Sequence, residues 1–509
     1  MSERIPSIAH ILVVGFHHQK GATVEFSYPP LQAADIENAE QQSITNLLPT
    51  EWKCLPYLAL PDGCHNYDED SVYFSLPCPG TAKISKSVGD GGSLGSVVHG
   101  IACCRQLDAK DVLSGNEELT RSTVQKSVCV LSRIPVFGFI EAKLNLVTHA
   151  YFNSKDFSEV SILRDAYDSL NATLSASLSP ELFSLGLSQQ DLVIQYHHRL
   201  LQILKALLLR KRVVVFGQQA RIVTNAVLSI ASLLPGTLAS SLKGSTVDDK
   251  DGYGFPLDVF SEPLSIQPYI CLQQMELLMD EQSPCIIAGV VNPLFEKQKE
   301  KICGVFVNLT DGLVTVVDPA LKSQLHLSSA DLRFCSVLSK SMQRSPTSPT
   351  SPIESDGSKL QYSDWLGSNE WILAQFKLYL LSLLATSTSV AHTPAMDDFN
   401  PEFMIVWLKS SIFTIWYKSH GSSKKISDVE PKHVCEGSLS IGDLKRRLVA
   451  QASDYGLNIQ SKEQVTSAVH QTQKALSSAV SSMWSSASSA VHQWWYPDQH
   501  KADDKENYS

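Results

Sequence analysis

The chain has 509 residues, of which 43% are hydrophobic and 18% carry a formal charge. That hydrophobic fraction is enough to build packed cores, so a wholly disordered chain is excluded, and the length corresponds to about three domains. The 42 lysines and arginines are outnumbered by 52 aspartates and glutamates, which gives a formal net charge of −10. Because contact with phosphate backbones needs clustered basic residues, this acidic balance argues against a nucleic-acid-binding protein.

The first 155 residues carry the pattern of a sheet covered by a helix. Residues 8–16 and 22–28 alternate in polarity on either side of a short polar segment, which predicts a β-hairpin. Further strands are expected at 72–74, 97–103 and 126–131, and a helix that packs on the sheet is expected at 137–151.

The N-terminus and the cysteines indicate a reducing compartment. The apolar run at 8–16 is not followed by the small-residue cleavage site of a secretory signal. The 11 cysteines are an odd number and contain no C-x-x-C pair, so they are interpreted as small buried hydrophobic residues. A cytoplasmic location is therefore expected.

A second α/β region follows. Ser188 and Asp191 have the spacing of a capping box, and apolar residues then recur at helical spacing from 192 to 208. A buried strand is expected at 213–217 and a helix at 221–234. Further strands are expected at 286–291, 302–307 and 313–317, the last two joined across Asp311 and Gly312. The alternation predicts a parallel or mixed sheet covered by helices.

Residues 341–358 are rich in serine and proline and poor in apolar residues, which predicts a disordered linker. Ser345, Ser348 and Ser351 each precede a proline, so they are candidate sites of proline-directed phosphorylation, and a plain spacer is the alternative. Two strong helices are expected beyond the linker, at 369–385 and 400–417.

The sequence offers no convincing catalytic, cofactor-binding or metal site, and no cofactor is expected. Residues 91–95 match the G-x-S-x-G pattern that surrounds a hydrolase nucleophile, with Ser93 at its centre. The residues before it are polar and rich in lysine, serine and glycine, whereas a nucleophile elbow follows a hydrophobic strand. A flexible loop is the favoured interpretation, and a serine hydrolase is the alternative.

Six short segments occur in a fixed order along the chain. They are VEFSYPPL (24–31), LPYLALPDGCHN (55–66), YFSLP (73–77), HRLLQILKALLLRKRVVVFG (198–217), IIAGVVNPLF (286–295) and VVDPAL (316–321). Over residues 5–420 this ordered set resembles the DENN superfamily, and most closely the Avl-type late secretory pathway proteins.

The resemblance implies a tripartite α/β architecture with a longin-like N-terminal lobe, a central α/β lobe and trailing helices. The expected boundaries are 1–155 for the longin-like lobe, 156–335 for the central lobe, 336–360 for the linker and 361–420 for the downstream helices. Beyond the resemblance, the residue pattern alone gives 421–462 for a linker or helix, 463–496 for an amphipathic helix and 497–509 for a disordered tail.

The resemblance also implies a function. Many relatives are guanine-nucleotide exchange factors for Rab GTPases, and exchange needs no nucleophile because it favours the nucleotide-free conformation of the GTPase. A Rab-type GTPase is therefore the expected partner. The branch implies a role in late secretory transport, recycling endosomes and cell migration, at the surface of those membranes. A non-catalytic scaffold or GTPase effector is the alternative.

Residues 463–496 carry a stripe of apolar residues opposite a face of serines, with almost no formal charge. This pattern predicts an amphipathic helix that enters packing defects of curved membranes through its apolar side chains. The candidate membrane contacts are Val469, Leu476, Val480, Met483, Trp484, Val491, Trp494 and Trp495. A helix docked on the protein's own lobes and a disordered tail remain alternatives. Residues 421–509 carry no net charge, so hydrophobic insertion is the expected route to lipid.

Overall fold

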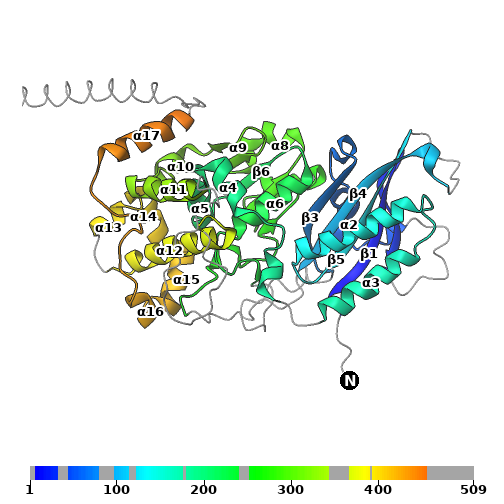
Figure 1. Ribbon diagram of the computed structural model, residues 1–509, viewed down its shortest axis with the longest axis horizontal. Helices are drawn as coiled ribbons and strands as arrows, with labels where there is room; N and C mark the ends of the chain where they lie inside the picture. The colour runs from blue at the N-terminus through cyan, green and yellow to red at the C-terminus, as the bar shows by residue number, and fades with distance from the viewer. Residues whose placement is uncertain are drawn as a thin grey trace, which may run out of the picture. The chain divides into compact units, whose positions relative to one another are not determined.

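The computed structural model describes residues 6–31, 44–79, 97–113, 122–175, 179–239, 252–342, 366–389 and 393–454. The chain divides into two compact units, residues 1–437 and 438–509. The described part of the second unit contains helix α17 (Ile441–Asp454). None of the helices in these ranges is both long enough and apolar enough to cross a membrane. All other elements below belong to the first unit (Figure 1).

The first sheet is antiparallel and has the strand order β2-β1-β5-β4-β3. Its strands are β1 (Ile8–His17), β2 (Gly21–Tyr28), β3 (Glu69–Pro77), β4 (Val97–Asp108) and β5 (Thr123–Ser132). The predicted hairpin is confirmed by the antiparallel pairing of β1 with β2, and the three other predicted strands of this region lie within β3, β4 and β5.

Successive side chains of the first sheet enter two different cores, because a strand alternates its faces. Ile11 and Val13 pack under α2 (Phe137–Asn153) and α3 (Ser161–Leu174), which lie along one face of the sheet (Figure 1). The predicted helix at 137–151 is confirmed by α2. Asn171 of α3 accepts a hydrogen bond from the backbone N–H of Ile8 at 2.8 Å, so α3 is fixed to the first strand.

The opposite face of this sheet shares its core with the second half of the unit. Leu12 and Val14 point into a cluster that also holds Val223 of α6 (Ala220–Ala231), Tyr269 and Cys271. The short helix α1 (Leu55–Ala59) supplies further apolar side chains to the same cluster. The first sheet and the elements that flank the second sheet therefore share one hydrophobic core.

The second sheet has the order β10-β9-β6-β8-β7 and is mixed, as predicted. Its strands are β6 (Val213–Phe216), β7 (Ile266–Gln267), β8 (Ile287–Val290), β9 (Val305–Asn308) and β10 (Leu313–Val316). The pairs of β6 with β8, β6 with β9 and β7 with β8 are parallel, and only β10 runs antiparallel in this sheet. Gly312, with a φ of +68°, makes the predicted turn between β9 and β10.

Two predicted helices are each divided in the structure. The apolar pattern at 192–208 predicted one helix, but α4 (Gln189–Tyr196) ends at His197, whose φ is +48°, and α5 (Arg199–Leu208) begins after it. The pattern at 400–417 is likewise divided into α14 (Pro401–Leu408) and α15 (Ser411–His420). In the second case Ser410 accepts a hydrogen bond from Phe413 N, so a new N-cap competes with continuation of the first helix.

The predicted capping box is confirmed, because Ser188 Oγ accepts a hydrogen bond from Asp191 N at 3.1 Å. Helix α12 (Asn369–Ser387) confirms the helix expected at 369–385. The remaining helices are α7 (Glu276–Met279), α8 (Pro293–Lys297), α9 (Lys299–Ile302), α10 (Pro319–Gln324), α11 (Ser329–Met342), α13 (Pro394–Asp397) and α16 (Lys424–Ser427). Short 3₁₀ helices lie at Ile44–Leu47, Thr50–Trp52, Cys64–Asn66, Ala109–Asp111, Pro180–Phe183, Asp258–Phe260 and Leu272–Gln274.

Gly367 brings the end of α11 close to the start of α12. Its φ is +87°, and a Cβ added there would lie 3.0 Å from the carbonyl oxygen of Ser341. The carbonyl oxygen of Gly367 also accepts a hydrogen bond from Gln190 Nε2 of α4 at 2.5 Å. Residues 342 and 366 are thus neighbours in the fold.

A carboxylate of the first sheet caps a helix of the second half. Asp70 on β3 accepts hydrogen bonds from Ala220 N at 3.0 Å and Arg221 N at 3.2 Å, at the start of α6. Such a bond satisfies backbone donors that the helix itself leaves unpaired. Burial raises the pKa of Asp70, although the hydrogen bonds from Arg221 and its neighbours oppose that rise.

Replacing Asp70 by alanine should lower the free energy of unfolding by about 1–3 kcal/mol, because two N–H groups at the start of α6, one of them buried, lose their acceptor. Asp70→Asn should cost less, since its amide oxygen still accepts one hydrogen bond. Denaturant unfolding of both variants measures the loss. Exposed Asp68, two residues away, is the control, and Asp68→Ala should change stability by less than about 0.5 kcal/mol. Equal stabilities of Asp70→Ala and Asp68→Ala would contradict the capping role.

Candidate functional site

The site residues expected from the sequence lie outside the described residues. This holds for the candidate membrane contacts within 463–496, for Ser345, Ser348 and Ser351 in the serine–proline segment, and for Ser93. Predictions about them therefore stay predictions. Across the described ranges, no group of three or more histidine, cysteine, aspartate or glutamate side chains is arranged to hold a metal ion.

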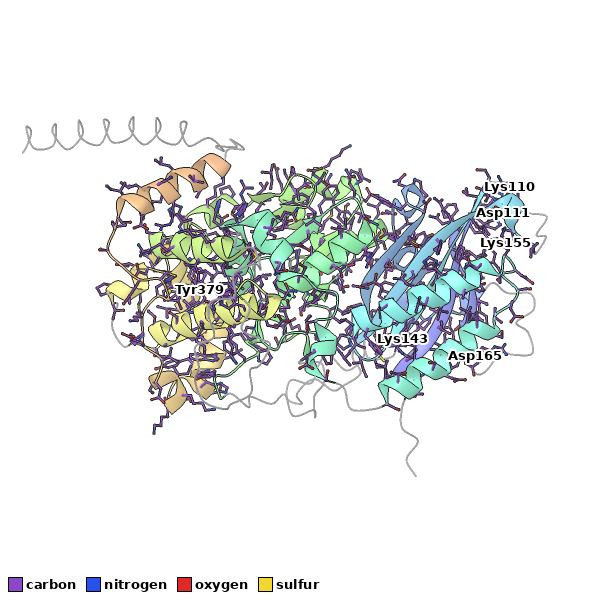
Figure 2. The ribbon with its side chains drawn as sticks, viewed as in Figure 1. Lys110, Asp111, Lys143, Lys155, Asp165 and Tyr379 are labelled. Atoms are coloured by element: carbon purple, nitrogen blue, oxygen red, sulfur yellow. The ribbon has the colours of Figure 1, made fainter. Side chains whose placement is uncertain are left out.

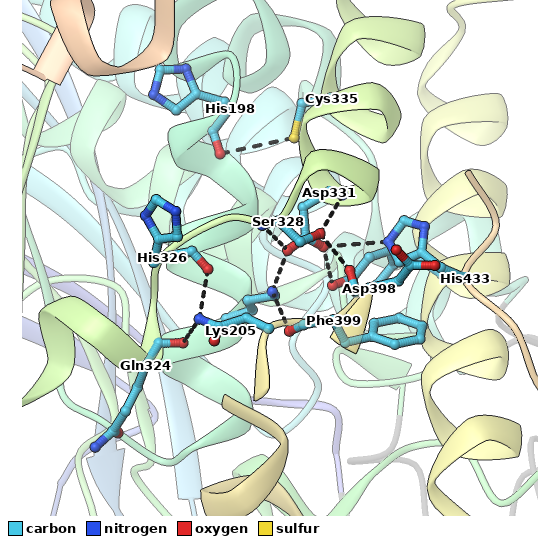
Figure 3. Close-up of polar contacts among 12 residues, drawn as sticks. His198, Lys205, Gln324, His326, Ser328, Asp331, Cys335, Asp398, Phe399 and His433 are labelled. Atoms are coloured by element: carbon cyan, nitrogen blue, oxygen red, sulfur yellow. Dashed lines mark hydrogen bonds and ion pairs between the residues drawn. The ribbon is translucent and has the colours of Figure 1, made fainter. Parts of the chain in front are cut away.

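A fully buried ion pair lies between α5 and α11 (Figure 3). Lys205 Nζ is 2.5 Å from Asp331 Oδ2, and both side chains have an exposed fraction of 0%. The ammonium also donates a hydrogen bond to the carbonyl oxygen of Phe399 at 2.9 Å and lies 4.9 Å from the centre of the Phe403 ring. The charge of Lys205 is therefore surrounded by an anion, a carbonyl and an aromatic face.

Asp331 accepts several other hydrogen bonds. Tyr379 donates its hydroxyl to Oδ1 at 2.9 Å, and the backbone N–H of Ser328 donates to Oδ2 at 3.0 Å. His433 Nε2 lies 3.4 Å from Oδ1, while its Nδ1 accepts a hydrogen bond from Cys435 N at 3.0 Å. Because Nδ1 is an acceptor, the ring hydrogen sits on Nε2 and points at the carboxylate.

The electrostatic balance keeps Asp331 ionised. Burial alone would raise the pKa of Asp331, but the charge of Lys205 and the hydrogen bond from His433 outweigh it and hold that pKa well below its usual range. Burial and the neighbouring Asp331 carboxylate raise the pKa of Tyr379, so the phenol stays protonated and remains a donor. The cluster is a buried ion pair whose carboxylate accepts further hydrogen bonds.

This cluster is a structural centre, because solvent and substrates cannot reach it. Lys205, Asp331, Tyr379 and His433 are all inaccessible in the folded unit. It connects α5, α11, α12, the turn before α14 and the segment at residue 433. The signal in the sequence was one lysine within the apolar pattern at 192–208, but nothing local identified its partner.

Asn400 connects the same turn to α10. Its φ is +75°, and its Nδ2 lies within hydrogen-bonding distance of the carbonyl oxygens of Ser323, Gln324 and His326, at 2.8, 3.2 and 2.8 Å. Its Oδ1 accepts from Glu402 N at 3.0 Å and so caps α14. Asparagine is suited to this position because it tolerates the left-handed region and offers both donors and acceptors.

Lys205→Met should destabilise the protein by about 3–5 kcal/mol, because it leaves the Asp331 carboxylate buried without a counter-ion. The double variant Lys205→Met with Asp331→Asn should lose less than the single variant, since no charge then remains buried. Chemical denaturation of the three proteins measures these differences. A double variant at least as unstable as Lys205→Met would show that the unpaired charge is not the cause.

The contribution of Asp331 to folding stability depends on pH, and the sign of that dependence is defined. The folded pKa of Asp331 lies below the ordinary value of 3.8, so its ionisation stabilises the fold above that pH and this contribution is lost as the pH falls through and below it. The stability advantage of the native protein over the double variant should therefore shrink in acid.

An open groove of about 570 Å³ lies at the amino ends of β6, β8 and β9. Its charged lining is mixed, with Arg210, Lys211, Arg212, Glu262, Glu281, Glu300, Lys301 and Asp318. Arg210 pairs with Glu262 at 2.5 Å, and the Arg212 guanidinium donates to the carbonyl oxygens of Cys285 and Asp280 at 3.0 and 2.9 Å. Small-molecule pockets are mostly apolar and enclosed, so this groove fits a protein surface better.

Other charges on the first half of the unit form surface pairs. Lys155 lies 3.5 Å from Asp111, and Lys110 lies 3.1 Å from Asp108, at the end of β4 (Figure 2). Exposed pairs of this kind contribute about 0–1 kcal/mol to stability. The first pair joins the chain after α2 to the chain after β4, and the second lies within one short segment.

The proline-containing segments of the sequence have a structural role. Asn292 accepts a hydrogen bond from Leu294 N at 3.0 Å, and Asp318 accepts from Ala320 N at 2.9 Å, so these residues cap α8 and α10. In each helix the following proline occupies the first turn, where its missing N–H costs nothing. Both segments therefore start short helices of the fold.

Comparison with known proteins decides the family. The family model for the transport protein Avl9 matches residues 8–251 and 239–387. The chain belongs to the Avl9 family. It is 29% identical over 464 residues to the late secretory pathway protein avl9 of Schizosaccharomyces pombe, covering 84% of this chain and 90% of that protein.

It is also 27% identical over 499 residues to the late secretory pathway protein AVL9 of Saccharomyces cerevisiae. That alignment covers 86% of this chain but 62% of the yeast protein, so the chain spans less than two thirds of that relative. The resemblance to Avl-type proteins is thereby confirmed, and so is the mixed α/β class. The assignment of individual DENN lobes and their boundaries stays a prediction.

Proposed function

We propose that this Avl9-family protein regulates late secretory and endosomal vesicle trafficking by acting on a Rab-type small GTPase. The observation that carries the proposal is the family match, together with two relatives named as late secretory pathway proteins. Because Avl9 proteins are DENN-like, guanine-nucleotide exchange is the activity to test first. Exchange by a protein of this kind is a shift of the GTPase towards its nucleotide-free conformation.

The groove at the amino ends of β6, β8 and β9 is the surface we propose for the GTPase. Its lining carries charges of both signs, and Glu281 and Lys301 are among the exposed ones. An arrangement of both signs suits the polar, mixed-charge surface of a protein partner and fixes its register.

Stimulated release of labelled GDP from one member of a panel of Rab GTPases is the expected result with the full chain. The charge swap Glu281→Lys with Lys301→Glu keeps the net charge and should reduce the rate of release at least tenfold, since like charges would then face each other across the interface. The matched control is the swap Lys409→Glu with Asp428→Lys, at exposed positions outside the groove, which should leave the rate unchanged.

Three outcomes distinguish the hypotheses. Binding that depends on the bound nucleotide, without faster release, would support the alternative of an effector or scaffold. A Rab that responds equally to native protein and to both charge swaps would remove the groove from the proposal. Failure to bind any member of the panel would overturn the GTPase proposal itself.

We also propose that the C-terminal segment 463–496 holds the protein at the surface of recycling-endosome or late secretory membranes, where it would support cell migration. The support for this membrane contact is the sequence pattern alone, in which bulky apolar residues alternate with uncharged serines at helical spacing.

We propose in addition that Ser345, Ser348 and Ser351 are phosphorylated, which would add charge to the segment between α11 and α12.

The double variant Trp484→Ala with Trp494→Ala should lose most of its binding to small, loosely packed liposomes, because these side chains supply apolar area for insertion. Flotation of the full chain with liposomes of two diameters measures this. The native protein should prefer the smaller ones at any ionic strength. Binding that is equal for both diameters, or unaffected by the two substitutions, would contradict membrane insertion.

A further inference from the structure

Two pairs of thiols are in contact among the 11 free cysteines, all of which lie in the described ranges. Cys54 is hydrogen-bonded to Cys271, and Cys64 is hydrogen-bonded to Cys104. The first pair joins distant parts of the chain: Cys54 precedes α1, beneath the first sheet, whereas Cys271 follows β7 of the second sheet. Both side chains contact the core that the two sheets share.

Solvent access differs between the two pairs. Cys54 is partly exposed, and its partner Cys271 is fully buried. In the other pair both thiols are buried, with exposed fractions of 5% for Cys64 and 3% for Cys104. The first pair is therefore the more accessible of the two to a small solute.

The thiol pKa values distinguish the two pairs in the same way as solvent access does. The hydrogen bond from Cys271 lowers the pKa of Cys54 to about 7, although partial burial opposes this. The same contact, together with burial, raises the pKa of Cys271, so that thiol stays protonated. It also donates a hydrogen bond to Gln274 Oε1 at 3.5 Å. Contact with Cys64 and burial raise the pKa of Cys104. Thiolate is the reactive form, which singles out Cys54 near neutral pH.

We propose that Cys54 and Cys271 form a redox modification site that a hydroperoxide converts into an intramolecular disulfide. The Cys54 thiolate attacks one oxygen of the peroxide, the O–O bond breaks, and the departing alkoxide or hydroxide takes up a proton from water. The product is a sulfenic acid on Cys54, an early and reversible step of thiol oxidation.

Cys271 then resolves this intermediate. Its sulfur attacks the Cys54 sulfur, the S–S bond forms, the S–O bond breaks, and the oxygen leaves as water with the proton of Cys271. In sum, two thiols and one hydroperoxide give one disulfide, one alcohol or water from the peroxide, and one further water. A dithiol reductant reverses the change by thiol–disulfide exchange.

The disulfide would add a covalent link to the junction of the two sheets. It would close a long loop of the chain, from α1 to the segment after β7, and closing a long loop restricts the unfolded ensemble. The oxidised protein is therefore expected to unfold at a higher denaturant concentration than the reduced protein.

Peptide mapping of the full chain after treatment with hydrogen peroxide tests the proposal. A peptide that links Cys54 to Cys271 should appear in the native protein and disappear after dithiothreitol. Before oxidation, iodoacetamide should modify Cys54 about tenfold faster at pH 7 than an ordinary thiol, with a midpoint near pH 7 in its pH–rate profile. In Cys271→Ala that midpoint should move up towards the ordinary range.

The buried pair provides the internal control, because Cys64 and Cys104 should stay reduced and unlinked under the same treatment. Cys54→Ser changes a partly exposed side chain, so it should fold and form no linked peptide. The proposal is overturned if the native protein yields no Cys54–Cys271 peptide, if Cys54 is oxidised only to sulfinic acid, or if Cys64 and Cys104 react at the same rate. Peptide mapping of the native protein decides the matter even where a variant does not fold.

Discussion

The ion pair of Lys205 and Asp331 is the constraint on which the helical half of the first unit depends. An unpaired charge in a dry interior is so costly that each side chain fixes the position of the other. Because Tyr379 and His433 donate to the same carboxylate, α12 and the segment near residue 433 are held by the same requirement. α5, α11, α12 and the segment near residue 433 are thus all tied to one buried carboxylate.

Local patterns predicted much of the fold, whereas long-range partners were not predictable. The hairpin of β1 and β2, the capping by Ser188 and the turn at Gly312 all depend on residues close in sequence. By contrast, Asp331 is 126 residues from Lys205, and Asp70 is 150 residues from the helix start that it caps. Hydrophobic periodicity carries no information on such pairs, and it missed the break at His197 because a positive φ depends on tertiary contacts.

The candidate functional features differ, for the same reason, in whether the sequence alone could reveal them. The segment at 463–496 could be predicted from the sequence because an amphipathic helix is a periodic pattern. The groove and the Cys54–Cys271 pair were not found, because each is assembled from separate segments that meet only in three dimensions. The shared core beneath the first sheet unites these features, since it places α6 and Cys271 against the same strands and turns two sheets into one cooperative body.

The close approach at Gly367 has a consequence for how this family can evolve. Because residues 342 and 366 are neighbours, the two ends of the stretch between them are held close together. The entropic cost of closing such a loop grows only with the logarithm of its length, about 0.6 kcal/mol for each doubling. Residues can therefore be gained, lost or replaced between these two points at little cost to the body, so this position suits lineage-specific control segments.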